Sequence, residues 1–205
     1  MASEWLLIVA IVGIWIAVYA RDKSLRVKRS QFIRTYRWPP GLLYKIRAKH
    51  PGLTPADAAA VARGLQQFFA AHLMSGQKFV AMPSQAVDEL WHEFILYTRD
   101  YEQFCKQAFG RFMHHTPAAA MGPYAARRTR DGLRRIWWFA CKDEDINPKH
   151  ATRLPLLFAL DGELQIPNGF RYDLNCAALE KNGVTNVHCI NELVEVPDVP
   201  DTCGD

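Results

Sequence analysis

The chain opens with an uncharged apolar run, WLLIVAIVGIWIAVYA, over residues 5–20. This run limits the fold more than any other feature, because a membrane-spanning helix needs about 20 apolar residues, within a range of about 17–25. The run is sixteen residues long, and the first residues of the chain can extend it. Trp5, Trp15 and Tyr19 suit the membrane–water interfaces. The run therefore predicts a single transmembrane helix as the first unit, residues 1–22.

The charges beside the run predict its orientation. Residues 21–49 hold ten Lys and Arg and one acid, Asp22. Lys and Arg concentrate on the cytoplasmic side of membranes. We therefore expect the N-terminus outside and the main domain in the cytoplasm, at the inner membrane if the source is bacterial. The basic juxtamembrane segment, residues 23–40, is expected either to lie along lipid headgroups or to form a solvated linker.

Two other interpretations of the run compete with a membrane anchor. A cleaved signal peptide is consistent with the small residues in VYA before Arg21, but Glu4 and the absence of a positive charge reverse the usual start of such a peptide. A buried core helix is disfavoured, because the run is uniformly apolar and lies at a terminus.

Residues 41–175 carry helical hydrophobic periodicity and predict a compact helical domain. Thr54 is a good N-cap with Pro55 at the first helical position, and Ser84 caps a second helix. A later stretch, HATRLPLLFALDGELQI, predicts a helix that starts near Pro155, although its Asp-Gly pair could instead turn a hairpin.

The last thirty residues, 176–205, hold six acids and one base and predict an extended acidic tail. The fold class predicted from these segments is mainly α, with an N-terminal single transmembrane helix, a compact helical domain and that tail. The five cysteines include no C-x-x-C pair, which favours reduced thiols over a disulfide scaffold.

The stretch DELWHEFILYT, residues 88–98, holds the first candidate site. At about 100° per residue, Trp91 falls on an apolar stripe, while Asp88 and His92 share a second stripe as an i, i+4 pair. A carboxylate at this spacing can hold an imidazole in one tautomer, for metal binding or for proton transfer. The apolar neighbours predict that the polar stripe is at least partly buried, where it needs partners.

Candidate partners follow downstream. Gly110 is expected to end the next helix, so a turn could bring either His114 or His115 beside the polar stripe. Cys105 falls on the core stripe of a continuous helix, and it joins the site only if that helix kinks near Asp100. Trp91 and Tyr101 are expected to give structural support.

Three hypotheses follow from these residues. The first is a zinc or iron site formed by Asp88 and His92 with His114 or His115, and with Cys105 as a further candidate ligand. The second is a metal-free network of hydrogen bonds inside a helical core. The third is general acid–base chemistry by His92, oriented by Asp88. No H-E-x-x-H motif, phosphate loop or nucleophile elbow accompanies them.

An arginine-rich segment, GPYAARRTRDGLRRIWWFACKDEDINP, supplies a second candidate surface. Its candidate anion- or lipid-binding residues are Arg127, Arg128, Arg130, Arg134 and Arg135. A solvated helix face is the competing interpretation. The expected partners are membrane lipid and another protein; nucleic acid is not expected, because no nucleic-acid-binding module is present.

Five stretches together resemble the glycine-rich domain-containing protein family: VDELWHEFILYT, YEQFC, FGRFMHHTP, LPLLFALD and GFRY. The resemblance covers about residues 80–175. It implies that Asp88, Trp91, His92, Tyr101, Cys105 and one of His114 and His115 match the family pattern, and it implies no particular activity. Two features depart from the pattern. Phe94 stands where longer members place a second histidine, and the Gly-rich tail is missing.

The function predicted from the sequence is a membrane-anchored cytoplasmic helical module for binding or assembly, with a metal site centred on His92. The alternative is a metal-dependent enzyme that uses His92 and Asp88 with His114 or His115. Both functions require a further side chain, from another part of the chain, to lie beside Asp88 and His92.

Overall fold

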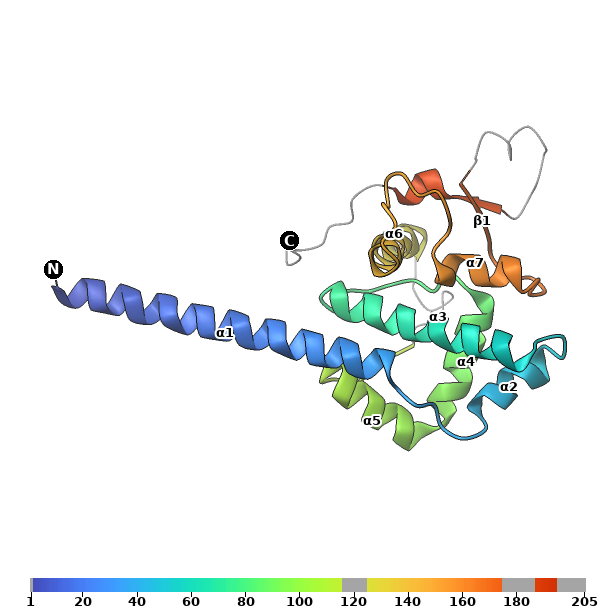
Figure 1. Cartoon of the computed structure of the whole chain (residues 1–205), viewed down its shortest axis with the longest axis horizontal. Coiled ribbons are helices and arrows are strands. Elements are labelled where there is room, and N and C mark those ends of the chain that lie inside the picture. The colour runs from blue at the N-terminus through green and yellow to red at the C-terminus, as the bar shows by residue number, and fades with distance from the viewer. Residues whose placement is uncertain (1, 116–124, 175–186, 195–205) are drawn as a thin grey trace.

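Figure 1 shows the computed structural model of the protein, which describes residues 2–115, 125–174 and 187–194. Within these residues the chain is mainly helical. The elements in chain order are α1 (Ala2–Arg34), α2 (Leu42–Lys49), α3 (Pro55–Met74), α4 (Gln85–Leu96), α5 (Thr98–Phe109), α6 (Ala125–Asp143), α7 (Leu156–Glu163), β1 (Arg171–Asp173), β2 (Val187–Cys189) and the 3-10 helix η3 (Ile190–Leu193).

Helix α1 is long, and much of it projects away from the rest of the molecule (Figure 1). Among the described residues, none of the helices has the length and apolar character needed to cross a membrane. This finding corrects the prediction of a transmembrane helix over residues 1–22. The uncharged run covers sixteen residues. That is roughly 24 Å of helix at about 1.5 Å per residue, against a hydrocarbon core of about 30 Å, and Arg21 follows directly in the same helix.

The predicted topology depended on that spanning helix. The outside N-terminus, the cytoplasmic main domain and the inner-membrane location were all inferred from that helix. These predictions are therefore corrected together with it. The unit boundary expected at residue 22 lies inside α1, which continues to Arg34. The end of α1 packs on the body of the molecule: Ile33 is fully buried, and the ring of Phe32 lies 5.8 Å from that of Phe104.

Helix α3 is central and packs against α1, α2, α4, α6 and α7. Its start follows from local sequence, as predicted. The Asp57 amide donates to Thr54 Oγ1 at 3.2 Å, and the Thr54 amide donates to the Asp57 carboxylate at 2.8 Å. This capping box, with Pro55 at the first position, satisfies amides that have no partner inside the helix.

Aromatic rings fill the core where α3, α4 and α5 meet. The Phe69 ring lies 4.8 Å from that of Phe104 and 5.8 Å from that of Trp91, and all three side chains are buried. Buried aromatic residues contribute about 150–250 Å² of contact area each. The packing therefore holds α4 and α5 in fixed positions against α3.

The C-terminal part of the domain combines a helix with a small sheet. Helix α7 begins after Pro155, which confirms the helix preferred over a hairpin there. Strands β1 and β2 pair in parallel, with Arg171 opposite Val187. This pair adds a strand component that the mainly α prediction lacked, because three-residue strands carry too little alternation to be recognised.

The predicted extended tail over residues 176–205 is corrected where the structure describes it. Residues 187–193 form β2 and η3, and they pack on the body through Ile190 and Leu193, both buried. The apolar side chains outweigh the acidic composition of the segment, because their burial removes apolar surface from water. The rest of that segment lies outside the described residues.

The cysteines differ in state. Cys105 and Cys141 are free and buried, as the expectation of reduced thiols requires. Cys189 is disulfide-bonded, so that expectation does not hold for it. Burial raises the pKa of the Cys141 thiol to about 12, which keeps it protonated and unreactive.

Candidate metal centre

The candidate site is built on α4, and a buried carboxylate fixes the start of that helix. Asp161 in α7 is 1% exposed. Its carboxylate accepts hydrogen bonds from Ser84 Oγ at 2.7 Å, from the Gln85 amide at 2.6 Å and from the Ala86 amide at 3.2 Å. The Phe170 amide donates to it at 2.9 Å. A negative charge at a helix N-terminus is stabilised by the helix dipole and the free amides, so α7 sets the position of α4.

Two faces of α4 carry different side chains, as the helical wheel predicts. Trp91 is buried against α3, where its ring lies 5.1 Å from that of Phe68. Asp88 and His92 lie one turn apart on the outer face, with side chains 25% and 48% exposed. The stripe is therefore less buried than predicted at His92, because this face borders an open cleft instead of another helix.

The chain after α5 is held against the core by a relay of hydrogen bonds. Gly110 ends α5 with a left-handed φ of 75°. Trp91 Nε1 donates to Tyr101 Oη at 3.2 Å, and Tyr101 Oη donates to the Met113 carbonyl at 2.6 Å. Burial raises the pKa of Tyr101 far above its usual value, so the phenol stays a donor. Trp91 and Tyr101 therefore fix the backbone two residues before His115.

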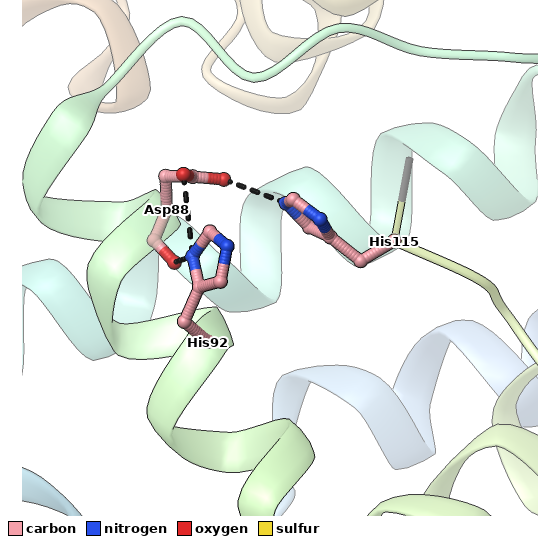
Figure 2. A group of neighbouring side chains, drawn as sticks. All are labelled: Asp88, His92 and His115. Carbon is pink, nitrogen blue, oxygen red and sulfur yellow. Dashed lines mark hydrogen bonds and ion pairs between the residues drawn. The ribbon is translucent and has the colours of Figure 1, made fainter. Parts of the chain in front are cut away.

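Figure 2 shows the result: Asp88 and His92 project from one helix, and His115 reaches them from a separate segment. His115 Nε2 lies 3.1 Å from Asp88 Oδ1. The His115 ring meets the Trp91 ring edge-on, with centroids 4.5 Å apart. His92 Nδ1 lies 3.3 Å from Asp88 Oδ2 and donates to the Asp88 carbonyl at 2.7 Å, which leaves its Nε2 with a free lone pair.

These three residues offer one carboxylate oxygen and two imidazole nitrogens, and one ligand atom from each lies within 4.8 Å of the others. Ligand atoms bound to a tetrahedral zinc ion at about 2.0–2.1 Å are about 3.3 Å apart. The pair formed by His115 Nε2 and Asp88 Oδ1, at 3.1 Å, is already close to this spacing. A carboxylate with two imidazoles is a donor set that suits zinc or iron.

Two of the predicted ligands do not join the cluster. The ring of His114 lies 4.9 Å from that of Phe112. His114 lines the same cleft as His115 but brings no ligand atom to the cluster. Cys105 is fully buried. Burial raises the pKa of its thiol, while contacts with the Met113 backbone and with Tyr101 act in the opposite direction. Among the described residues, Cys105 therefore belongs to the support behind the site and not to the ligand set.

The cluster forms part of the wall of a cleft of about 740 Å³. Other parts of the wall come from the segment before α4, the segment after α5 and the start of α6, including Phe79, Arg111 and Arg128. An ion held by the cluster would therefore lie beside a cleft whose volume is typical of small-molecule binding sites.

The predicted arginine surface divides into separate places. Arg127, Arg128 and Arg135 line one depression with Lys78 and Phe79. Arg130 lines another, beside Tyr172 and His188. Arg134 Nε donates to the Glu192 carbonyl at 3.0 Å. Only Arg128 among the five also lines the cleft of the cluster.

Sequence reasoning missed Asp161 and Arg111, although it did name Arg128 as a candidate anion-binding residue. The signal for Asp161 was present, because an acid inside the apolar run LPLLFALD resembles the pattern that marked Asp88. The sequence prediction places Asp161 in a helix, with an Asp-Gly turn as the alternative, and gives it no role at the site. No local signal marks Arg111, because only the tertiary structure brings it to the same cleft as α4.

Comparison with known proteins gives one family. A sequence profile described as UCP032817-like matches residues 28–193. No curated protein and no solved structure matches the chain. The profile corrects the resemblance to the glycine-rich domain-containing family. Trp91, Tyr101 and Cys105 carried much of that resemblance, and all are buried, so their order reflects packing in a helical core.

Proposed function

We propose that this chain, which belongs to the UCP032817-like family, binds a divalent transition-metal ion through Asp88, His92 and His115. The convergence of these three side chains carries the proposal. His115 is 27 positions from Asp88, yet its Nε2 lies 3.1 Å from the Asp88 carboxylate. A bound ion would replace the hydrogen bond between these two groups.

The contacts around the cluster support an ion-binding role. The Nδ1–H of His92 donates to the Asp88 carbonyl, and metal-bound histidines commonly use their second nitrogen in this way. The ring of His115 is held edge-on by Trp91. Both imidazoles are thus oriented by groups that are not themselves ligands.

Three protein ligands leave at least one coordination position open, which is typical of catalytic metal sites and differs from closed structural sites. The cleft beside the cluster gives such a position access to small molecules. An ion there would act as a Lewis acid on a bound ligand. This observation favours a metal-dependent enzyme or ligand-binding protein over a purely structural ion.

Elemental analysis of purified full-length protein tests the proposal. The protein is incubated with zinc, cobalt(II) or anaerobic iron(II) and then freed of unbound ion. We expect stoichiometric metal in the wild type and in His114→Ala, and loss of metal in His92→Ala and His115→Ala. The His114 variant is a matched control, because it removes the neighbouring imidazole, which lies outside the cluster.

Two outcomes would overturn the proposal. One is a folded wild-type protein that binds no ion. The other is equal loss of metal in the His114 and His115 variants. Either result would assign Asp88, His92 and His115 to a network of hydrogen bonds. Thermal unfolding of each variant shows whether it is folded.

A further inference from the structure

The chemistry of the cleft beside Asp88, His92 and His115 identifies the kind of molecule that it can hold. Its volume, about 740 Å³, lies within the range of about 300–1,000 Å³ typical of small-molecule sites. Phe79, Met82, Phe112 and Phe170 contribute apolar surface to the wall. A ligand that fills this space therefore needs an apolar body.

The charges that line the cleft are mostly positive. Arg111 and Arg128 contribute two guanidinium groups, and Asp88 is the sole acid among the described residues of the wall. If Asp88 is a metal ligand, the charge of the ion more than offsets its carboxylate. The occupied cleft is then strongly cationic, and a cleft of one sign of charge concentrates ligands of the opposite sign.

Among the residues that the structure describes, the contacts that position the two guanidinium groups do not occupy all of their donors. Arg128 lies over the Phe79 ring, with its central carbon 4.4 Å from the ring centroid. Arg111 donates one hydrogen bond, at 2.9 Å, to the Gln77 carbonyl. A guanidinium has five N–H donors in a fork that matches a carboxylate. Each arginine thus retains donors for an oxyanion.

From these features we infer that the cleft binds an organic carboxylate with an apolar body. The carboxylate would fill the open coordination position of the ion and pair with Arg111 or Arg128, while the apolar body would lie among Phe79, Phe112 and Phe170. The inference rests on the proposed metal site, and it adds the class of ligand.

Cobalt(II) bound to the full-length protein provides the test, because its visible absorption changes when a ligand enters its coordination shell. Benzoate is titrated as the probe, with benzamide as a neutral molecule of the same shape and inorganic phosphate as an anion without an apolar body. We expect benzoate to change the spectrum with a dissociation constant at least about tenfold lower than either comparison compound.

Arginine variants locate the binding. Arg111→Gln and Arg128→Gln should each raise the dissociation constant for benzoate by about tenfold, while cobalt(II) affinity stays within about twofold of wild type. Arg130→Gln is the matched control. It removes the same charge from the same helix as Arg128, but its side chain lines a different depression.

The outcomes separate the two proposals. Absence of a cobalt(II) spectrum contradicts the metal site itself, and the ligand inference falls with it. A normal cobalt(II) spectrum that benzoate does not change, or that benzamide changes equally, contradicts the ligand inference alone. An equal effect of Arg130→Gln would show general electrostatic attraction and would also overturn it.

Discussion

His115 Nε2 lies 3.1 Å from Asp88 Oδ1, while the adjacent His114 faces Phe112. The path of the backbone determines which of the two histidines reaches Asp88. The Tyr101 hydroxyl holds that backbone by donating to the Met113 carbonyl. The identity of the third ligand therefore depends on a phenol in the core, twelve positions from the carbonyl that it binds.

Replacement of Tyr101 by Phe tests this dependence. The change keeps the ring and removes the donor to Met113, so a buried carbonyl and the Trp91 indole lose their partner. We expect a loss of about 1–3 kcal/mol in the free energy of unfolding. Metal affinity should fall by about 10–100-fold, as is typical when a group that orients ligands is lost.

Tyr97→Phe is the matched control for that change. The Tyr97 hydroxyl donates to the Pro40 carbonyl at 3.3 Å in an exposed position away from the cluster. Denaturant unfolding and metal titration of both variants make the comparison. Unaltered metal affinity in Tyr101→Phe would show that the hydroxyl does not position His115.

Asp161→Ala should destabilise the protein strongly. The substitution leaves Ser84 Oγ and the amides of Gln85 and Phe170 without their acceptor. Each unsatisfied buried donor costs roughly 1–3 kcal/mol, so we expect a total loss of at least about 3 kcal/mol in the free energy of unfolding. Glu163→Ala, an exposed acid in the same helix, should change it by less than about 0.5 kcal/mol. Similar denaturation midpoints for the two variants would contradict the anchoring role of Asp161.

His72 makes stability depend on pH. It is 7% exposed, and its Nδ1–H donates to the Lys78 carbonyl at 3.0 Å. Its pKa is lowered to about 4: burial is the largest cause, the bond to the Lys78 carbonyl opposes the shift, and the nearby Arg111 charge adds to it. Between about pH 6.5 and pH 4 the unfolded chain therefore binds a proton that the folded chain does not.

The sign of the pH dependence follows from that difference. Stability is complete above about pH 6.5 and is lost as pH falls toward 4, by on the order of 3 kcal/mol in total. His72→Gln removes the titrating group and keeps a donor for the Lys78 carbonyl. Denaturant unfolding at pH 7 and pH 4.5 should show a smaller fall in stability for the variant. Equal falls in the two proteins would exclude His72 as the source.

Gly132→Ala should push α6 away from the segment that holds Phe79 and Ala81. A Cβ at this position would lie 2.7 Å from the Ala81 backbone nitrogen and 2.9 Å from the Phe79 ring. Overpacking of this kind costs about 1–3 kcal/mol, which exceeds the gain of about 1 kcal/mol from helix propensity. We expect a lower melting temperature and weaker binding of benzoate by the cobalt(II) protein.

Gly162→Ala is expected to raise the stability of the protein, in contrast to Gly132→Ala. In α7 the nearest atom to its added Cβ would be 4.0 Å away, so the helix propensity of Ala should raise stability by about 0.5–1 kcal/mol. Thermal unfolding compares the two glycine variants directly. A stable Gly132→Ala protein would show that α6 does not approach the segment around Phe79 closely.

Local sequence was sufficient for several elements of the fold. Thr54 and Ser84 begin α3 and α4 because each side chain accepts from amides only three positions away. The pair of Asp88 and His92 followed from helical periodicity alone, since residues four apart share a face. These features depend on short spacings, which the chain itself determines.

The tertiary structure decided the rest. It selected His115 over His114, placed Cys105 in the core, brought Asp161 to the start of α4, and joined Arg111 and Arg128 in one cleft. Two predictions drawn from composition were wrong: the transmembrane helix in the apolar N-terminal run, and the extended tail where the structure describes the acidic C-terminal segment. Composition and periodicity describe one segment at a time. Contacts between distant residues depend on how the buried faces of all the helices pack together, and the order of residues within one segment does not determine that packing.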